Sequence, residues 1–196
     1  MLHTCNNGGC HIKTIECNQE FQSVVEAVAD DSGVDMNCAN AQDHVAAAEC
    51  NNCTIKELIH TTCHRSGYAV IPKQMIMVLA EHSVKQLNVF PAKHGISQCH
   101  SPETITTGRT VDCNKHCQHE FGTCAQAHDE PRKKKSVKER SIDSMCLRPT
   151  HSKQGGHQVV NLSTGLTLTH SQITPIPLTQ FVKNTVEALA IEQGCT

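Results

Sequence analysis

Cysteine and histidine are the side chains with the greatest capacity for chemistry in this sequence. The 196 residues include 13 Cys and 14 His, a composition that suits either a disulfide framework or zinc sites. The segment Met1 to Gly9 shows no basic stretch followed by an apolar one. We therefore expect an intracellular protein, cytoplasmic or nuclear and not secreted, with reduced thiols. An odd cysteine count also leaves one thiol unpaired in any disulfide scheme.

Two groups of Cys and His suggest zinc binding. The first matches a zinc-like spacing, but the apolar periodicity predicts that a single helix carries the whole group. Ten residues of helix rise by roughly 15 Å, so its two ends cannot share one ion. The second group, within 113–124, matches no tetrahedral template, and a zinc-binding protein built on it is kept as an alternative. The first group is Cys50, Cys53, His60 and Cys63; the second is Cys113, His116, Cys117, His119 and Cys124.

Positive charge is concentrated in one short stretch. The whole chain has a formal net charge of -2, yet six of the nine residues from 132 to 140 are Lys or Arg. Such a run is usually a solvated loop, and the functional interpretation is contact with nucleic-acid phosphates. A module that binds DNA or a polyprotein partner is therefore a second hypothesis. No apolar stretch is long enough for a bilayer, so no membrane association is expected. The basic residues are Arg132, Lys133, Lys134, Lys135, Lys138 and Arg140.

The most informative polar pattern joins an expected strand to an expected helix. Glu16, Asn18 and Glu20 alternate, so they lie on one side of an extended segment, and Glu49 lies near the start of the helix after the next strand. This layout resembles that of RNase H-like folds.

The sequence contains no glycine-rich phosphate loop and no G-x-S-x-G motif. Nucleotide hydrolysis and serine acyl transfer are therefore unsupported.

The first half of the chain is predicted to be of the α/β class. Alternating residues indicate strands at 11–17 and 34–38, with a helix over 20–30 between them. Apolar residues at helical spacing then predict two antiparallel helices, over 43–65 and 72–90.

The second half is predicted to be mostly β. After Pro91, Gly and Pro interrupt the helical pattern. Short alternating segments at 120–125, 144–147, 157–162 and 166–169 predict a small antiparallel β-barrel, followed by a helix over 178–191. The expected domains are 1–95, a linker over 96–116, the barrel over 117–177, and a C-terminal helix over 178–196.

Short sequence blocks along nearly the whole chain carry a family resemblance. They lie at residues 15–21, 48–57, 87–95, 101–103, 107–109, 147–149, 154–157, 162–165 and 173–177. In content and order they resemble the integrase region of copia-type retrotransposon polyproteins. The resemblance implies that 1–95 is the C-terminal part of an RNase H-like integrase core, and that the barrel is the one that follows integrase, upstream of the reverse transcriptase.

The resemblance also implies a lost activity. Such integrases join DNA strands by phosphoryl transfer, with three carboxylates holding two Mg²⁺ ions. Glu49 falls at the helical glutamate and Asn18 at the middle aspartate, while the first aspartate would lie upstream of Met1. Because Asn lacks the charge that helps to hold a hard dication, we expect no catalysis and no cofactor, with Glu49 at best a residual Mg²⁺ ligand.

Further departures from the family point to decay. Cys50, Cys53, Leu58 and His60 stand where relatives typically carry arginine, which leaves Lys56 as the evident phosphate-facing cation of the helix. Three more cysteines stand where an aromatic would be natural, in keeping with an aromatic content of only 3%. The leading hypothesis is a noncatalytic remnant whose two remaining strands leave an apolar face uncovered. The three cysteines are Cys63, Cys124 and Cys146.

Overall fold

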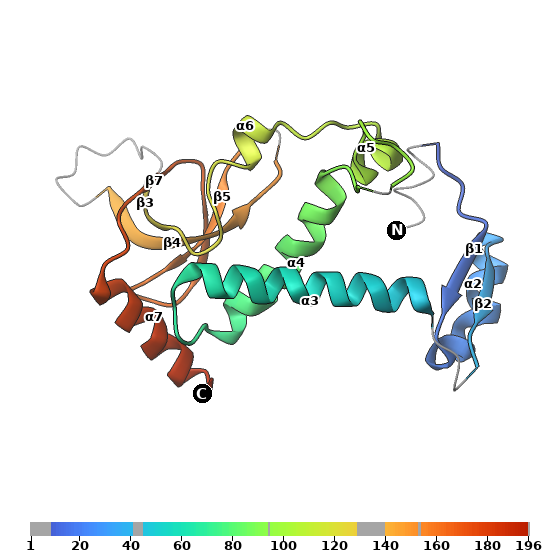
Figure 1. The fold of residues 1–196 in the computed structure, drawn as a ribbon, viewed down its shortest axis with the longest axis horizontal. Coiled ribbons are helices and arrows are strands. Elements are labelled where there is room, and N and C mark those ends of the chain that lie inside the picture. Colours follow the sequence, from blue (N-terminus) through green and yellow to red (C-terminus); the bar gives the residue numbers. More distant parts are fainter. Residues whose placement is uncertain (1–8, 41–44, 94, 129–139, 153, 196) are drawn as a thin grey trace. The chain divides into compact units, whose positions relative to one another are not determined.

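The chain forms two compact units, which are described separately. The structure is a computed structural model that describes residues 9–40, 45–93, 95–128, 140–152 and 154–195. Unit 1 comprises Met1–Lys56 and Leu87–Thr110, and unit 2 comprises Glu57–Gln86 and Val111–Thr196. Within the described ranges no helix has the length and apolar character needed to cross a membrane. Figure 1 shows the order of the elements along the chain.

Unit 1 is built on a two-stranded parallel sheet. β1 (Thr14–Cys17) pairs with β2 (Asp35–Cys38) in parallel. Parallel strands need a crossover connection, which here is the 3-10 helix η1 (Gln19–Val24) followed by α2 (Val25–Ser32). Gly33 ends α2 in the left-handed conformation, with a φ of 65°, and its N–H donates to the Ala29 carbonyl. The predicted order of strand, helix and strand is confirmed.

Two long helices and one short helix follow the parallel sheet along the chain. α3 (Ala46–Ser66) and α4 (Lys73–Val89) each contribute residues to both units. α5 (Pro102–Thr107) belongs to unit 1 and begins at Ser101, whose hydroxyl oxygen accepts a hydrogen bond from the Thr104 N–H at 3.2 Å. The two long helices match the sequence prediction closely, because their apolar positions recur at helical spacing over several turns.

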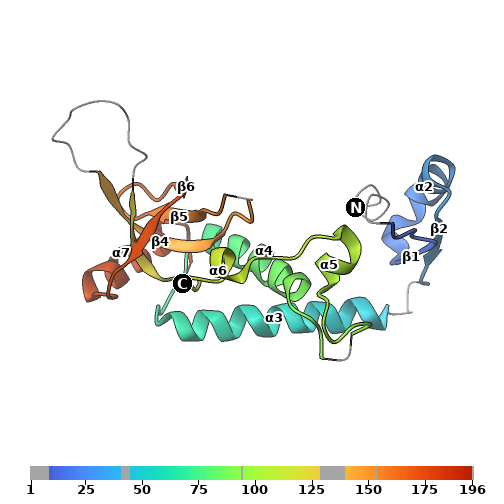
Figure 2. The same cartoon turned by 90° about the horizontal axis from the view of Figure 1, so that it is seen from above.

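Unit 2 contains a five-stranded antiparallel sheet. Its strands run in the order β6-β5-β4-β3-β7, with β6 and β7 at the edges. Figure 2 shows β4, β5 and β6 of this sheet. The pairing of β4 with β5 shifts register between Cys146 and Arg148. The short helix α6 (Cys113–His116) precedes β3, and α7 (Gln180–Glu192) follows β7. The strands are β3 (Cys124–His128), β4 (Ser141–Pro149), β5 (His157–Asn161), β6 (Thr167–His170) and β7 (Ile173–Pro175).

The core of unit 2 lies between this sheet and three helical segments. Tyr68, which follows α3, is buried, and its hydroxyl donates to the Gly122 carbonyl at 3.1 Å. From α4 come Met75 and Leu79, and from α7 come Val182 and Val186. They pack against apolar side chains of the sheet and of the loops next to it, which are Phe121, Cys124, Met145, Leu147, Val160 and Leu162. This cluster identifies the packing partner of the last helix, which the sequence did not reveal.

The closed barrel expected from the sequence is not found in the described residues. The sheet is open, because its edge strands β6 and β7 pair only with β5 and β3, respectively. These strands have 4 and 3 residues, and α4 and α7 supply apolar side chains that close the core where further strands would do so in a barrel. The fold is therefore of the mixed α/β class, with an open antiparallel sheet.

The compact units also divide the chain differently from the expected domains. The sequence suggested a boundary after residue 95 and a separate C-terminal helix from 178. In the structure, Glu57–Gln86 and α7 both belong to the unit that contains the antiparallel sheet. The physical reason is that Met75 and Leu79 bury their side chains among those of β4 and α7.

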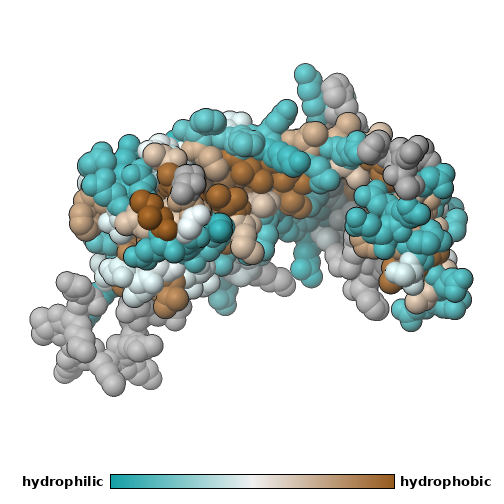
Figure 3. Space-filling model, turned by 90° about the horizontal axis from the view of Figure 1, so that it is seen from below, coloured by the Kyte–Doolittle hydropathy of each residue, from teal (hydrophilic) through white to brown (hydrophobic). Residues whose placement is uncertain are grey.

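Several large apolar side chains remain at the surface. Met77 on α4 is 69% exposed, and Phe181 and Ile191 on α7 are also exposed. Figure 3 shows hydrophobic surface, in brown, on the face that it draws. In unit 1, Phe21 and Val24 of η1 are exposed as well.

Candidate functional site

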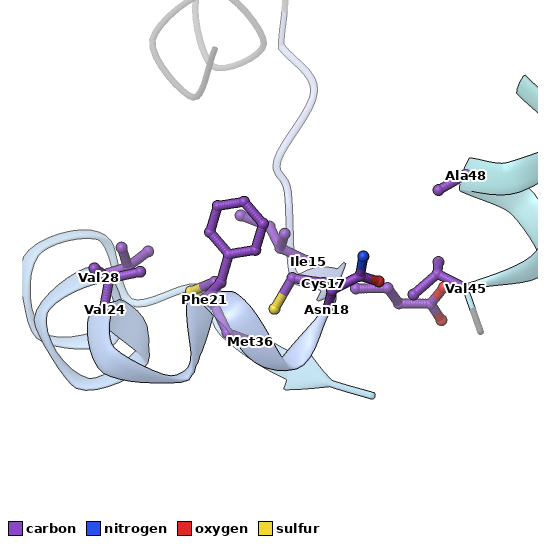
Figure 4. Close-up of a pocket in the computed structure, with 10 residues that line it drawn as sticks. Ile15, Cys17, Asn18, Phe21, Val24, Val28, Met36, Val45 and Ala48 are labelled. Carbon is purple, nitrogen blue, oxygen red and sulfur yellow. The ribbon is translucent and has the colours of Figure 1, made fainter. Parts of the chain in front are cut away.

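Asn18, one of the two residues predicted to matter for catalysis, lines an apolar pocket of unit 1. The pocket has a volume of about 440 Å³, and Figure 4 shows the side chains around it. Glu16 and Asn18 lie at its rim, at the end of β1, and Val45 and Ala48 line it from the start of α3. The remaining lining is apolar and comes from both strands and from the crossover: Ile15, Cys17, Phe21, Val24, Val28 and Met36.

Asn18 directly follows β1 and is exposed. It occupies the N-cap position of η1, but its side chain makes no capping hydrogen bond. Its backbone carbonyl instead accepts from the Phe21 N–H at 3.0 Å. The amide is therefore not used to begin the helix, and it offers one neutral oxygen at the pocket.

Glu49 lies in the first turn of α3, directly after the pocket residue Ala48. Its carboxylate is exposed and its N–H donates to the Val45 carbonyl at 3.1 Å. A carboxylate in the first turn also favours helix formation through the helix dipole. Among the described residues, no group of three or more His, Cys, Asp or Glu is placed to hold a metal ion. Among the residues that line the pocket, Glu16 carries a carboxylate and Asn18 a neutral amide.

The predicted DNA-contacting residues fall into two sets. Lys56 is exposed on α3, and Arg140 is exposed just before β4. The other five residues lie outside the described part of the chain, between β3 and β4. They are Arg132, Lys133, Lys134, Lys135 and Lys138.

The structure separates the zinc-like groups. Cys50, Cys53, His60 and Cys63 all lie on α3, which confirms the prediction of a single helix. Cys63 packs against the core of unit 2, and burial raises its pKa. In the second group, Cys124 is buried in that same core, whereas Cys113 and Cys117 at the two ends of α6 are exposed.

Several histidines come together in unit 2. The His119 and His157 rings meet edge to face with centroids 4.9 Å apart, and the His116 and His151 rings stack at 5.1 Å. His119 and His157 also line a polar pocket of about 310 Å³, where the Nε2 of His128 lies 2.8 Å from the Thr174 hydroxyl. The sequence grouped His116 and His119 with nearby cysteines, but it gave no signal for their contacts with His151 and His157, which lie more than 30 positions further along the chain.

Burial makes two of these histidines poor bases. His157 is 5% exposed, and neither of its ring nitrogens has a hydrogen-bond partner among the described residues. Its pKa is lowered by burial and, to a smaller extent, by His119 and His116. Burial also lowers the pKa of His119. Both rings are therefore neutral at pH 7.

The chain was compared with families of proteins and with individual curated proteins. A scan against models of protein families found no match, and a search of curated proteins found none either. The function is consequently argued from the residues and their geometry.

Proposed function

We propose that the chain is a noncatalytic remnant of the integrase region of a copia-type retrotransposon polyprotein. The observation that carries this proposal is Asn18, which stands at the position of the middle catalytic aspartate within an ordered series of family-like blocks. Glu49 is the one family carboxylate that the sequence matches.

The local geometry of unit 1 supports the proposal. β1 pairs in parallel with β2, and α3 then begins with Glu49 in its first turn. This order is compatible with the RNase H-like layout that the resemblance implies. The pocket beside Asn18 is mainly apolar, and the two-stranded sheet leaves Phe21 and Val24 exposed. An incompletely covered sheet is what a partial copy of a larger α/β domain would present.

Loss of catalysis follows from the charge at this site. Two Mg²⁺ ions about 3.5–4 Å apart, as in two-metal sites, repel each other, and carboxylates must offset that repulsion. Asn18 contributes a neutral amide oxygen where the family pattern has a carboxylate, so the site has less negative charge to offset that repulsion. We infer that the chain holds no productive pair of metal ions.

The origin is tested by the nucleotide sequence on both sides of the reading frame. Protease or integrase remnants upstream and reverse-transcriptase remnants downstream are expected. Intact, unrelated genes that continue the same reading frame on both sides would contradict a retrotransposon origin.

The lost activity is tested by a strand-transfer assay with Mg²⁺ and a labelled DNA end. We expect no product from the natural chain, because Asn18 supplies no negative charge where the family pattern has an aspartate. Product formation by the natural chain would overturn the proposal of a noncatalytic remnant.

A second candidate function, nucleic-acid binding, rests on the basic run between β3 and β4. Six cations in nine positions could bind several phosphates, and removal of each phosphate-binding cation should reduce the slope of log affinity against log salt by about 0.9. Changing Lys133, Lys134 and Lys135 together to Gln is expected to reduce the slope by up to about 2.7. Lys56→Gln on α3 is the control for a single cation. Fluorescence anisotropy with duplex DNA measures the slope, and affinity that is independent of salt would exclude this function.

A further inference from the structure

Two thiols face each other at the end of the sheet in unit 1. Cys17 is the last residue of β1, Cys38 is the last residue of β2, and the parallel register pairs them directly. Their Sγ atoms lie 2.8 Å apart. Neighbouring strands lie about 4.8 Å apart, within the range of about 4.4–6.8 Å that a disulfide spans between Cα atoms. The backbone is thus already placed for a covalent bond between these side chains.

We propose that Cys17 and Cys38 are a redox modification site, where a small-molecule disulfide such as oxidised glutathione forms a reversible bond between β1 and β2. The Cys38 thiolate attacks one glutathione sulfur, and the first glutathione leaves as a thiolate. The Cys17 thiolate then attacks the Cys38 sulfur and displaces the second glutathione. Two protein thiols are oxidised to one disulfide, one glutathione disulfide is reduced to two thiols, and the two protons pass to the leaving thiolates.

Burial sets the order of these two steps. Cys17 is 9% exposed, whereas Cys38 is half-buried and therefore the more accessible nucleophile. The hydrogen bond between the two sulfurs, together with burial and the charge of Cys38, raises the pKa of Cys17 to about 11. Cys17 consequently rests as a thiol at neutral pH, and the closing step should accelerate as the pH rises.

Four other cysteines lack the cross-strand pairing of Cys17 and Cys38. Cys50 and Cys53 are exposed on α3, in unit 1 but outside its sheet. Cys113 and Cys117 also interact through their side chains, but they are only four positions apart. A bond between them would close a short loop and constrain little of the unfolded chain.

The bond would matter because the sheet has only two strands. Cys17 and Cys38 are 21 positions apart, so the bond would close η1 and α2 into a loop and restrict the unfolded chain. It would also fix Cys17, which lines the apolar pocket. Oxidation would therefore stabilise the crossover without any additional strand.

Peptide mapping of the full chain tests the proposal directly. The chain is incubated with oxidised glutathione, remaining thiols are alkylated, and a protease that cleaves after glutamate is added. Cleavage at Glu16, Glu20, Glu26 and Glu49 places each cysteine of the pair in a peptide with no other cysteine. We expect the linked species of 17–20 with 27–49, its disappearance on reduction, and amide hydrogen exchange in β1 and β2 slowed by about tenfold or more in the oxidised chain.

Serine variants provide the controls. Cys17→Ser and Cys38→Ser should each abolish the linked peptide, whereas Cys50→Ser on α3 should retain it. If the serine variants at the pair fail to fold, the map of the natural chain still decides the question. Alkylation of both Cys17 and Cys38 after oxidation, or linkage of Cys38 to another cysteine, would overturn the proposal.

Discussion

Two methionines on α4 show how strongly packing differs between neighbouring residues. Met75 is 1% exposed in the core of unit 2, whereas Met77 is 69% exposed. Met75→Ala should lower the free energy of unfolding by about 2–5 kcal/mol, because it leaves a cavity. Met77→Ala should change it by less than about 0.5 kcal/mol. Urea unfolding followed by circular dichroism measures both, and equal losses would contradict the packing of α4 on the sheet.

His157, which is buried, and His119, which is partly buried, should make unit 2 less stable in mild acid. Burial lowers the pKa of His157 and His119 below the value of about 6.5 expected in the unfolded chain. Between the folded and unfolded values the unfolded chain binds more protons, so this contribution is present above about pH 6.5 and is lost as the pH falls through the folded pKa.

Substitution isolates that contribution. His157→Gln should reduce the loss of stability between pH 7 and 5, and His119→Gln should act in the same direction. Thermal unfolding of each variant at the two pH values measures the difference. If both variants show the same pH dependence of stability as the natural chain, these two rings do not cause it.

At the residue scale, the sequence identified individual residues better than the contacts between residues. Asn18 and Glu49 were identified from alternation and family resemblance, and the structure places Asn18 and Ala48, next to Glu49, at one pocket. The contacts of Cys17 with Cys38 and of His119 with His157 were not predicted. The first contact depends on the register of β1 and β2, and the second joins a loop residue to a distant strand, information that spacing along the chain does not contain.

At the element scale, the last helix offers a matched pair of threonines. The Thr179 hydroxyl oxygen accepts from the Val182 N–H at 3.4 Å and caps α7. Thr179→Ala should cost about 1 kcal/mol of stability. Thr185→Ala, inside the same helix, should be neutral or slightly stabilising because Ala has the higher helix propensity. Chemical unfolding of the two variants compares them, and an equal effect would argue against the cap.

Long helices were predictable, and short elements were not. The apolar spacing predicted α3 and α4 to within a few residues, because each presents several turns of pattern. α5, α6 and β7 have only 6, 4 and 3 residues, so no period can be read from them. The predicted barrel was wrong for a related reason, since short strands reveal β structure without revealing whether the sheet closes.

At the scale of the whole molecule, the composition and the compact units divide the chain at different places. The change from a helical pattern to Gly and Pro after Pro91 suggested a boundary there. In the structure, Glu57–Gln86 belongs to the same compact unit as the antiparallel sheet. Hydrogen bonds add to the apolar contacts that hold this segment in unit 2. The Ala69 N–H donates to the Glu187 carboxylate at 3.1 Å, and the Gln74 side chain donates to the Gly165 carbonyl at 2.9 Å.

Truncated chains test this division. A fragment of residues 57–196 retains every side chain of the unit 2 core and should unfold cooperatively in urea, with an m-value normal for its length. A fragment of residues 96–196 lacks Tyr68, Met75 and Leu79. It should lose the cooperative transition, because the core side of its sheet would face water.

The first half supplies the complementary measurement. Residues 1–95 retain α4 but lack the sheet strands and α7 that bury Met75 and Leu79, and the parallel sheet leaves Phe21 and Val24 exposed. This fragment should unfold gradually and bind a hydrophobic dye. A sharp transition in 1–95 together with one in 96–196 would restore the boundary that the sequence suggested, because each half would then close its own core without the segment 57–86.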